Sequence, residues 1–327
     1  MANVYPNSTT GAFCKWLLAN SLIRLTSPRK VQVLNVQTAA TNGTTVTQLY
    51  FEEFCNYTNR FYWEWQQYIA GQPASPTSSG LDAMTTAWLA VATAPAQQTI
   101  YAVDVFFKQL RADANLQLDY FFLFAQDQQV NAKIDLINPT LYAITEHASP
   151  TWAANLGYTG NGSTMYLSVN FKDATNAVNY TTNNGMFGFY GRKVLTAAAI
   201  FDMGSYDGTN ESNMRVNYTG GLTYFNVNTN NSQNVASSNT QGLMIAQRTA
   251  SNLTTMWKNG LSAGTGATAS NGMSTVIDNI MCSNQNGTPT SYNTNQYTIA
   301  CKGSGAINMV TFNSAVNLLM TNLGAHY

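Results

Sequence analysis

The strongest constraint on the fold is a run in which apolar and polar residues alternate after a tight turn. The run ends the segment 151–171; its apolar members are Met165, Leu167, Val169 and Phe171, and its polar members are Tyr166, Ser168 and Asn170. An alternation with a period of two places the apolar set on one face of a β-strand. Because Asn161 and Gly162 favour a tight turn before the run, the segment predicts a turn that opens a strand with one buried face.

Further strand candidates follow at short intervals. They cover residues 185–190, 197–203, 212–218, 222–227, 242–249, 254–258, 276–281 and 297–301. Asp-Gly, Gly-Gly and Asn-Gly turns at 207, 220, 259 and 286 separate them. This pattern predicts an antiparallel β-sandwich or jelly roll.

Residues before the sandwich have other periodicities. Residues 81–115 predict a helical lead-in of two helices broken at Pro95. Residues 118–125 are nearly continuous in apolar character and predict a buried strand, and 134–136 predict a second, short strand. Near the C-terminus, an apolar stripe from Phe312 to Leu323 predicts a short helix that stops at Gly324.

The first 72 residues predict a small mixed α/β region for attachment or oligomerisation. An apolar segment runs from Phe13 to Ile23, and its steps from Phe13 to Leu17 fit a short helix. The other expected elements are a hairpin around Asn42-Gly43 and an aromatic-rich helix over 51–69. Residues 73–80 have the composition of a linker, so the sandwich domain is expected over 116–327. The aromatic stripe has the spacing of a buried helix face, although sugar stacking or a subunit contact is an alternative. Trp63 falls off the stripe and is the candidate for a partner contact.

The charge content excludes several functional classes. Only 9% of the residues are charged and the net charge is zero, against about 25% charged residues in ordinary soluble domains. Amides and hydroxyls must therefore provide solubility, which is typical of an all-β extracellular or virion protein. Nucleic acids and anionic membranes are not expected as partners. No apolar run approaches the roughly 18 residues of a membrane-spanning helix, and the polar N-terminus with Pro6 predicts no secretory signal.

The cysteines and histidines do not predict a metal site. Cys14, Cys55, Cys282 and Cys301 have no close Cys-x-x-Cys spacing, and the histidines are His147 and His326. Cys282 and Cys301 flank neighbouring strand candidates, so a disulfide is one reading. Free, buried thiols are the favoured reading, as expected after folding in a reducing cytoplasm.

A family resemblance rests on several short segments in one order. They are the helical lead-in to Leu110, the strand 118–125, the turn 137–139, Ser149 to Trp152, the Gly-Tyr-Thr-Gly-Asn-Gly turn 157–162, the Met-Trp-Lys-Asn-Gly hairpin 256–260 and the closing helix to Gly324. Together they resemble the concanavalin A-like lectin/glucanase domains of bacteriophage tail, fibre and other virion proteins. The resemblance implies a jelly-roll sandwich in a virion assembled in the host cytoplasm, homo-oligomeric and contacting other virion proteins through residues 1–80.

Glycosidase relatives in that wider group need a separate test. Glycoside hydrolysis uses two carboxyl groups that flank the scissile bond. The acidic residues from 151 onward are Asp173, Asp202, Asp207, Glu211 and Asp278, and they do not form the Glu-x-Asp-x-x-Glu strand pattern. We therefore expect no enzymatic activity and no cofactor. His147, beside Glu146, is expected in a surface loop.

Ligand contacts are expected from loop aromatics and amides. The candidates are Tyr158, Tyr190, Tyr206, Asn210 and Tyr224. Aromatic rings stack on sugar C–H faces and amides bind hydroxyl groups, although each could instead be a partly buried residue at a strand end. Asp207, Asn210 and Glu211 could hold Ca²⁺, but a capped turn is the favoured reading.

Two functions follow. The first is a virion protein whose sandwich contacts host-surface carbohydrate. The alternative is a structural decoration or connector protein that makes protein contacts and has no glycan ligand. Three exposed aromatics in one concavity would favour the first, and a flat apolar interface would favour the second.

Overall fold

The computed structural model divides the chain into two units, Met1–Pro76 and Thr77–Tyr327. It describes residues 23–27, 30–33, 47–50, 80–113, 116–195, 200–218, 220–236 and 239–324. Trp63, the helix predicted over 51–69, and Cys14 and Cys55 lie outside these residues. The predicted domain limits themselves stay predictions.

In the first unit the described backbone forms a three-stranded antiparallel sheet. Its strands are β1 Ile23–Ser27, β2 Lys30–Val33 and β3 Thr47–Tyr50. β2 and β3 pair with Val31 opposite Leu49, which confirms the predicted pairing of these two segments. The short helix expected from Phe13 to Leu17 lies outside the described residues, and β1 begins at Ile23.

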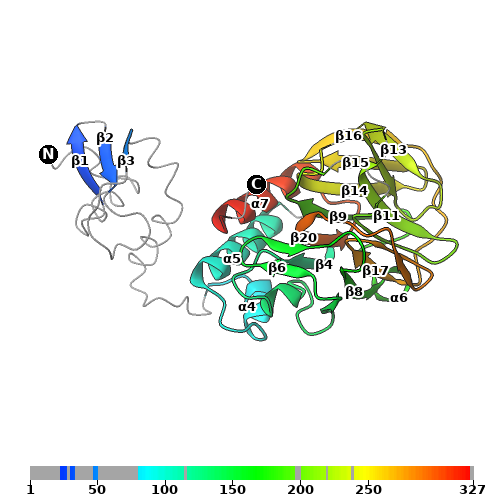
Figure 1. Cartoon of the computed structure of the whole chain (residues 1–327), viewed down its shortest axis with the longest axis horizontal. Helices are drawn as coiled ribbons and strands as arrows, with labels where there is room; N and C mark the ends of the chain where they lie inside the picture. Colours follow the sequence, from blue (N-terminus) through cyan, green and yellow to red (C-terminus); the bar gives the residue numbers. More distant parts are fainter. Residues whose placement is uncertain are drawn as a thin grey trace. The chain divides into compact units, whose positions relative to one another are not determined.

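The second unit contains two large sheets, which confirms the predicted antiparallel β-sandwich (Figure 1). The nine-stranded sheet contains β5 Ile144–His147, β8 Tyr166–Lys172, β10 Met203–Tyr206, β11 Glu211–Tyr218, β12 Leu222–Asn226, β13 Gln233–Ala236, β17 Ile277–Ile280, β18 Ser283–Gln285 and β19 Thr288–Thr290. The order is β13-β12-β11-β10-β17-β8-β5, with β18 beside β10 and β19 beside β18.

The eight-stranded sheet is the middle layer of the unit. It contains β4 Leu118–Leu123, β6 Thr151–Ala153, β7 Gly157–Thr159, β9 Gly185–Gly191, β14 Gly242–Ala250, β15 Leu253–Lys258, β16 Leu261–Gly266 and β20 Gln296–Gly303. The order is β16-β15-β14-β9-β20-β7-β6, with β4 also beside β20. Because both faces of β4 and β9 are covered, every residue of these two strands is buried.

One core fills the space between the sheets and a second lies under the helices. The first core includes Leu167, Val169 and Phe171 of β8, as the alternation predicted. The second core lies where three helices pack against the outer face of the eight-stranded sheet: α4 Ala83–Leu89, α5 Gln97–Ala112 and α7 Met309–Asn322 (Figure 1). The predicted pair of helices before the sandwich and the closing helix are therefore confirmed.

Turns and caps fix the ends of these elements. Asn259-Gly260 joins β15 to β16 and Asn286-Gly287 joins β18 to β19, and all four residues have positive φ angles of 50° to 87°. Two successive positive φ angles define the hairpin turn that Asn-Gly favours. The Asn308 side chain accepts the N–H groups of Val310 and Thr311 and so caps α7.

Two strand predictions need correction. Ile134 and Asp135 form isolated bridges, and no strand covers 134–136. The Asp135 carboxylate accepts the backbone N–H groups of both Phe121 and Ile137 at 2.9 Å and so turns the chain here. Of the strand predicted over 197–203 only residues 200–203 are described, and among these the strand β10 starts at Met203; it ends at Tyr206, before the Asp-Gly turn. Cys282 and Cys301 are free and buried, which confirms the favoured reading for this pair.

Candidate functional site

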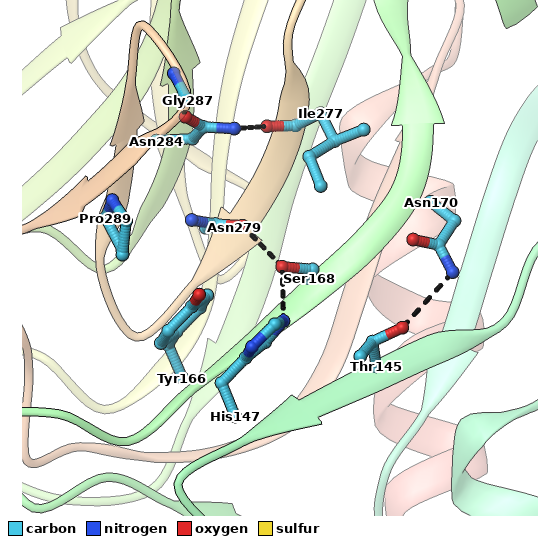
Figure 2. Close-up of a pocket in the computed structure, with 10 residues that line it drawn as sticks. All are labelled: Thr145, His147, Tyr166, Ser168, Asn170, Ile277, Asn279, Asn284, Gly287 and Pro289. Carbon is cyan, nitrogen blue, oxygen red and sulfur yellow. Dashed lines mark hydrogen bonds between the residues drawn. The ribbon is translucent and has the colours of Figure 1, made fainter.

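A cavity of about 220 Å³ opens on the nine-stranded sheet, on the face turned away from the core (Figure 2). Strands β5, β8 and β17 and the β18–β19 hairpin line it. Its residues are Thr145, His147, Tyr166, Ser168, Asn170, Ile277, Asn279, Asn284, Gly287 and Pro289. None of these lining residues carries a formal charge when His147 is neutral, so the cavity offers hydroxyl, amide and aromatic groups.

The alternation of β8 creates this cavity. Since Leu167 and Val169 point into the core, Tyr166, Ser168 and Asn170 must point to the opposite face. Antiparallel pairing sets His147 opposite Tyr166 on β5. The pairing of β17 with β8 sets Asn279 opposite Ser168. Three strands distant in sequence therefore bring their polar side chains to one place.

Two aromatic rings form one wall of the cavity. The rings of His147 and Tyr166 are parallel within 1°, and their centroids lie 4.1 Å apart. Both side chains are half-buried. Tyr292, just after β19, is tilted toward Tyr166 with its centroid 6.0 Å away. The stack holds His147 and Tyr166 in fixed orientations and leaves part of each ring in contact with solvent.

A hydrogen-bond chain fixes the protonation pattern of the cavity floor. The Ser168 hydroxyl donates to Asn279 Oδ1 at 2.9 Å. Its single hydrogen is then used, so Ser168 Oγ accepts the hydrogen of His147 Nε2 at 3.0 Å. Burial lowers the pKa of His147. The imidazole is therefore neutral near pH 7, and Nδ1 carries its lone pair.

Amide groups hold the other walls. Asn170 Nδ2 donates to the Ala143 carbonyl oxygen at 3.0 Å. Asn284 Nδ2 donates to the Ile277 carbonyl oxygen at 2.9 Å, and Asn284 Oδ1 accepts the Gly287 N–H at 2.8 Å. These bonds attach the β18–β19 hairpin to β17, so the cavity is part of the folded framework.

Two of the predicted ligand residues are not exposed, and their prediction as loop aromatics is wrong. Tyr158 lies in β7 with 0% of its surface exposed, and its hydroxyl donates to Glu146. Tyr190 lies in β9, also 0% exposed, in the core beneath the helices. The prediction failed because an aromatic residue close to a turn can already belong to the adjoining strand. Where both faces of that strand are covered, the ring is buried.

The other three predicted residues are half-buried, but none lines the cavity. Tyr206 ends β10, and its hydroxyl donates to the Gly208 carbonyl oxygen at 2.8 Å. Asn210 lies in the same turn. Tyr224 is on β12, where its ring meets that of Tyr218 edge-on at 4.8 Å. The structure thus places Tyr206 and Asn210 together and Tyr224 elsewhere.

The Asp207 turn is a capped turn. Asp207 Oδ1 accepts the N–H groups of Thr209 and Asn210, and Oδ2 accepts the N–H of Thr275. Burial alone would raise the pKa of Asp207, but these hydrogen bonds lower it to about 2. Glu211 is instead buried, bonded to the amides of Asn213 and Asn226. Within the described ranges, no three His, Cys, Asp or Glu side chains are grouped to hold a metal ion.

His147 was missed as a site residue because it was expected in a loop. It belongs to β5, and only the pairing with β8 brings it to Tyr166. The sequence did indicate that Tyr166, Ser168 and Asn170 face away from the core, since they are the polar members of the alternating run. Asn279 gave none, because its contact with Ser168 spans 111 residues.

Comparisons with known proteins give only distant structural likenesses. No family pattern and no curated protein sequence matches the chain. A botulinum neurotoxin serotype D binding domain has a TM-score of 0.42 and 9% identity, over 61% of this chain and 53% of that one. A Trypanosoma rangeli sialidase has a TM-score of 0.44 and 10% identity, over 68% and 40%.

A third solved structure is domain 4 of an extracellular arabinanase from Geobacillus stearothermophilus, in complex with arabinotriose. It has a TM-score of 0.37 and 8% identity, over 61% of this chain and 98% of that domain. The chain spans about half the length of the toxin binding domain that it matches. No helix in the described part of the chain is long and apolar enough to cross a membrane.

Proposed function

We propose that the sandwich binds an uncharged carbohydrate unit in the cavity lined by His147, Tyr166 and Ser168. The observation that carries this proposal is the parallel His147–Tyr166 stack beside a floor of neutral hydrogen-bonding groups. Sugars present both C–H faces, which stack on aromatic rings, and hydroxyl groups, which bind amides and hydroxyls.

The size and charge of the cavity limit the ligand. Its volume of about 220 Å³ is below the roughly 300 to 1,000 Å³ of pockets for drug-sized ligands. It therefore suits one sugar unit at the end or side of a chain. Since no Lys or Arg lines the cavity, it offers no charged partner for a phosphate or a carboxylate. Neutral sugars are the better ligands on both grounds.

The biological setting belongs to the same proposal. A bacteriophage virion protein that contacts host-surface carbohydrate, with residues 1–80 mounted on other virion proteins, fits the low charge content and the resemblance of the sequence segments. A homo-oligomer would present several weak sites at once, and linked sites raise the overall avidity without new contacts.

We propose binding without catalysis. Serine and histidine are residue types that act as nucleophile and general base in hydrolases. Here, however, the Ser168 hydroxyl donates its hydrogen to Asn279 and not to His147, so His147 does not activate it. A hydrolytic site also needs a group that orients the histidine, or two carboxyl groups for a glycosidase. No carboxylate lines this cavity among the described residues.

A glycan array probed with the full-length protein tests the proposal. We expect binding to neutral glycans, and a loss of about tenfold or more in affinity for Tyr166→Ala and for His147→Ala, equivalent to about 1.4 kcal/mol. Tyr224→Ala is the matched control, because this half-buried tyrosine lies on the same sheet but does not line the cavity.

The alternative role, a decoration or connector protein without a glycan ligand, makes the opposite prediction. In that case no neutral glycan binds above background, and Tyr166→Ala changes only assembly on the particle. Equal binding by wild type and both cavity variants would also refute this site.

A further inference from the structure

A charged cluster lies between the two sheets, fully enclosed by the sandwich. Lys302 is on β20 of the eight-stranded sheet, and Asp278 is on β17 of the nine-stranded sheet. Asp173 begins α6 Asp173–Asn176, directly after β8. No more than 1% of the surface of any of the three residues is exposed. A buried ammonium group with two carboxylates is rare, because removing charges from water is costly.

The two carboxylates have unequal surroundings. Lys302 Nζ lies 2.5 Å from Asp173 Oδ1 and 2.6 Å from Asp278 Oδ2. Asp278 also accepts hydrogen bonds from Tyr120 at 3.0 Å and Ser205 at 2.8 Å. Asp173 Oδ2 has no hydrogen-bond partner within the described structure. Asp278 therefore has three polar partners, whereas Asp173 is held by Lys302 alone.

Aromatic rings enclose the ammonium group. Lys302 Nζ lies 4.8 Å from the centroid of the Tyr180 ring and 5.5 Å from that of Phe187. Both rings are at most 1% exposed. The cluster is thus apolar around its polar centre and closed to bulk water, conditions under which a condensation that releases water is not readily reversed.

We propose that Lys302 and Asp173 form an intramolecular isopeptide bond in the folded protein, with Asp278 as the group that carries the proton. Three observations support it: the contact between the Lys302 amine and the Asp173 carboxyl group, the second carboxylate beside the same amine, and the dry enclosure. This inference is independent of the carbohydrate proposal, since Asp278 is buried on the core side of β17 while its neighbours Ile277 and Asn279 line the cavity on the other side.

The reaction balances without a co-reactant. One proton passes from the Lys302 ammonium to the Asp173 carboxylate, which leaves a neutral amine and a neutral acid. The amine nitrogen attacks Cγ of Asp173, so that a C–N bond forms, and Asp278 takes the second amine proton. Asp278 returns this proton to the leaving hydroxyl group as the C–O bond breaks, and one water molecule is released. Nothing is oxidised or reduced.

The electrostatics favour Asp173 as the acid that reacts. Burial, and then the charge of Asp278, raise the pKa of Asp173 to about 7, so its protonated form is accessible near neutral pH. Burial lowers the pKa of Lys302, but the two carboxylates outweigh burial and raise it. The raised pKa favours the ammonium form, so the neutral amine forms only when the proton passes to Asp173 within the cluster.

The bond would join the two sheets covalently. Its residues are 129 positions apart, so it would close most of the sandwich into one loop. A cross-link over a long loop restricts the unfolded chain and raises resistance to unfolding.

Intact-mass measurement of the full-length purified protein tests the proposal directly. We expect a mass lower than that of the sequence by one water molecule, and a branched peptide joining the Lys302 and Asp173 segments after proteolysis. Asp173→Ala should have the full mass of its sequence. Asp173→Asn should reach the same mass as the cross-linked wild type, because ammonia leaves instead of water and the product is identical.

Asp278→Asn separates the chemistry from the packing. It keeps the size of the side chain and leaves the ion pair between Lys302 and Asp173. We expect a folded chain, as judged by near-ultraviolet circular dichroism, with the full mass of its sequence. A folded wild-type protein that keeps its full mass after prolonged incubation at neutral pH would overturn the proposal. So would a water deficit that persists in Asp173→Ala.

Discussion

A single buried acid, Asp135, shows how one residue couples the fold to pH. Burial raises the pKa of its carboxyl to about 7, although the backbone N–H groups of Phe121 and Ile137 partly oppose the rise. The folded protein therefore binds one proton more than the unfolded chain between about pH 4 and pH 7. The contribution of Asp135 to the free energy of unfolding is therefore fully present below about pH 4, and it is lost as the pH rises to about 7.

Asp135→Asn should remove this dependence. At pH 5 we expect the variant to be more stable than wild type by only about 1 to 2 kcal/mol, because Asp135 is protonated in the folded protein but already ionised in the unfolded chain. At pH 8 we expect it to be more stable by at most about 4 kcal/mol, since the pKa rises from 3.8 to about 7 and each pKa unit is worth about 1.4 kcal/mol. Urea unfolding at both pH values measures the difference.

Asp113→Asn, at the end of α5, is the control for losing one carboxyl group, because Asp113 is only half-buried. A stability difference between Asp135→Asn and wild type that is the same at pH 5 and pH 8 would contradict the assignment.

The residues of the cavity were only partly predictable. The alternating run told which side chains of β8 turn outward, including Tyr166 and Ser168. It could not tell what they meet, because His147 and Asn279 reach Ser168 from 21 and 111 residues away. The cluster of Asp173, Asp278 and Lys302 was equally hidden, since each residue belongs to a different element. Local patterns define faces, while contacts between strands depend on the pairing order.

At the scale of elements the sequence was more informative. α5 and α7 were expected because their apolar residues recur at three and four positions, and those residues form the core under the helices. Of the strands beside Asn-Gly turns, β8 and β15 were expected within a few residues, whereas β18 and β19 were not. The order of strands in each sheet could not be predicted. Neighbours such as β9 and β20 pair with each other although about a hundred residues of chain separate them, and no local pattern indicates this pairing.

The importance of α7 can be tested on its two faces. Phe312 is fully buried against the eight-stranded sheet, whereas Val310 on the same helix is 57% exposed. We expect Phe312→Ala to lower the free energy of unfolding by about 3 to 5 kcal/mol, because a large cavity replaces the ring. Val310→Ala should change it by less than about 0.5 kcal/mol. Chemical denaturation of both variants compares the faces, and equal effects would mean that α7 does not pack as described.

At the scale of the whole molecule, the two proposed functions belong to different units. Both hydrophobic cores of the second unit consist of residues from Leu81 onward, and every residue that lines the cavity lies between Thr145 and Pro289. Binding should therefore need only the second unit. Attachment to a particle, if residues 1–80 provide it, should need the first.

A chain that starts at Thr77 tests this division. We expect it to unfold cooperatively, because its cores are intact, and to bind neutral glycans with the affinity of the full-length protein. Particles assembled with the shortened chain should lack it, as detected by immunoblotting of purified particles. Full-length Tyr166→Ala is the reciprocal control: it keeps residues 1–80, so it should enter particles while losing glycan binding. Incorporation of the shortened chain at the wild-type level would instead place the attachment surface on the sandwich.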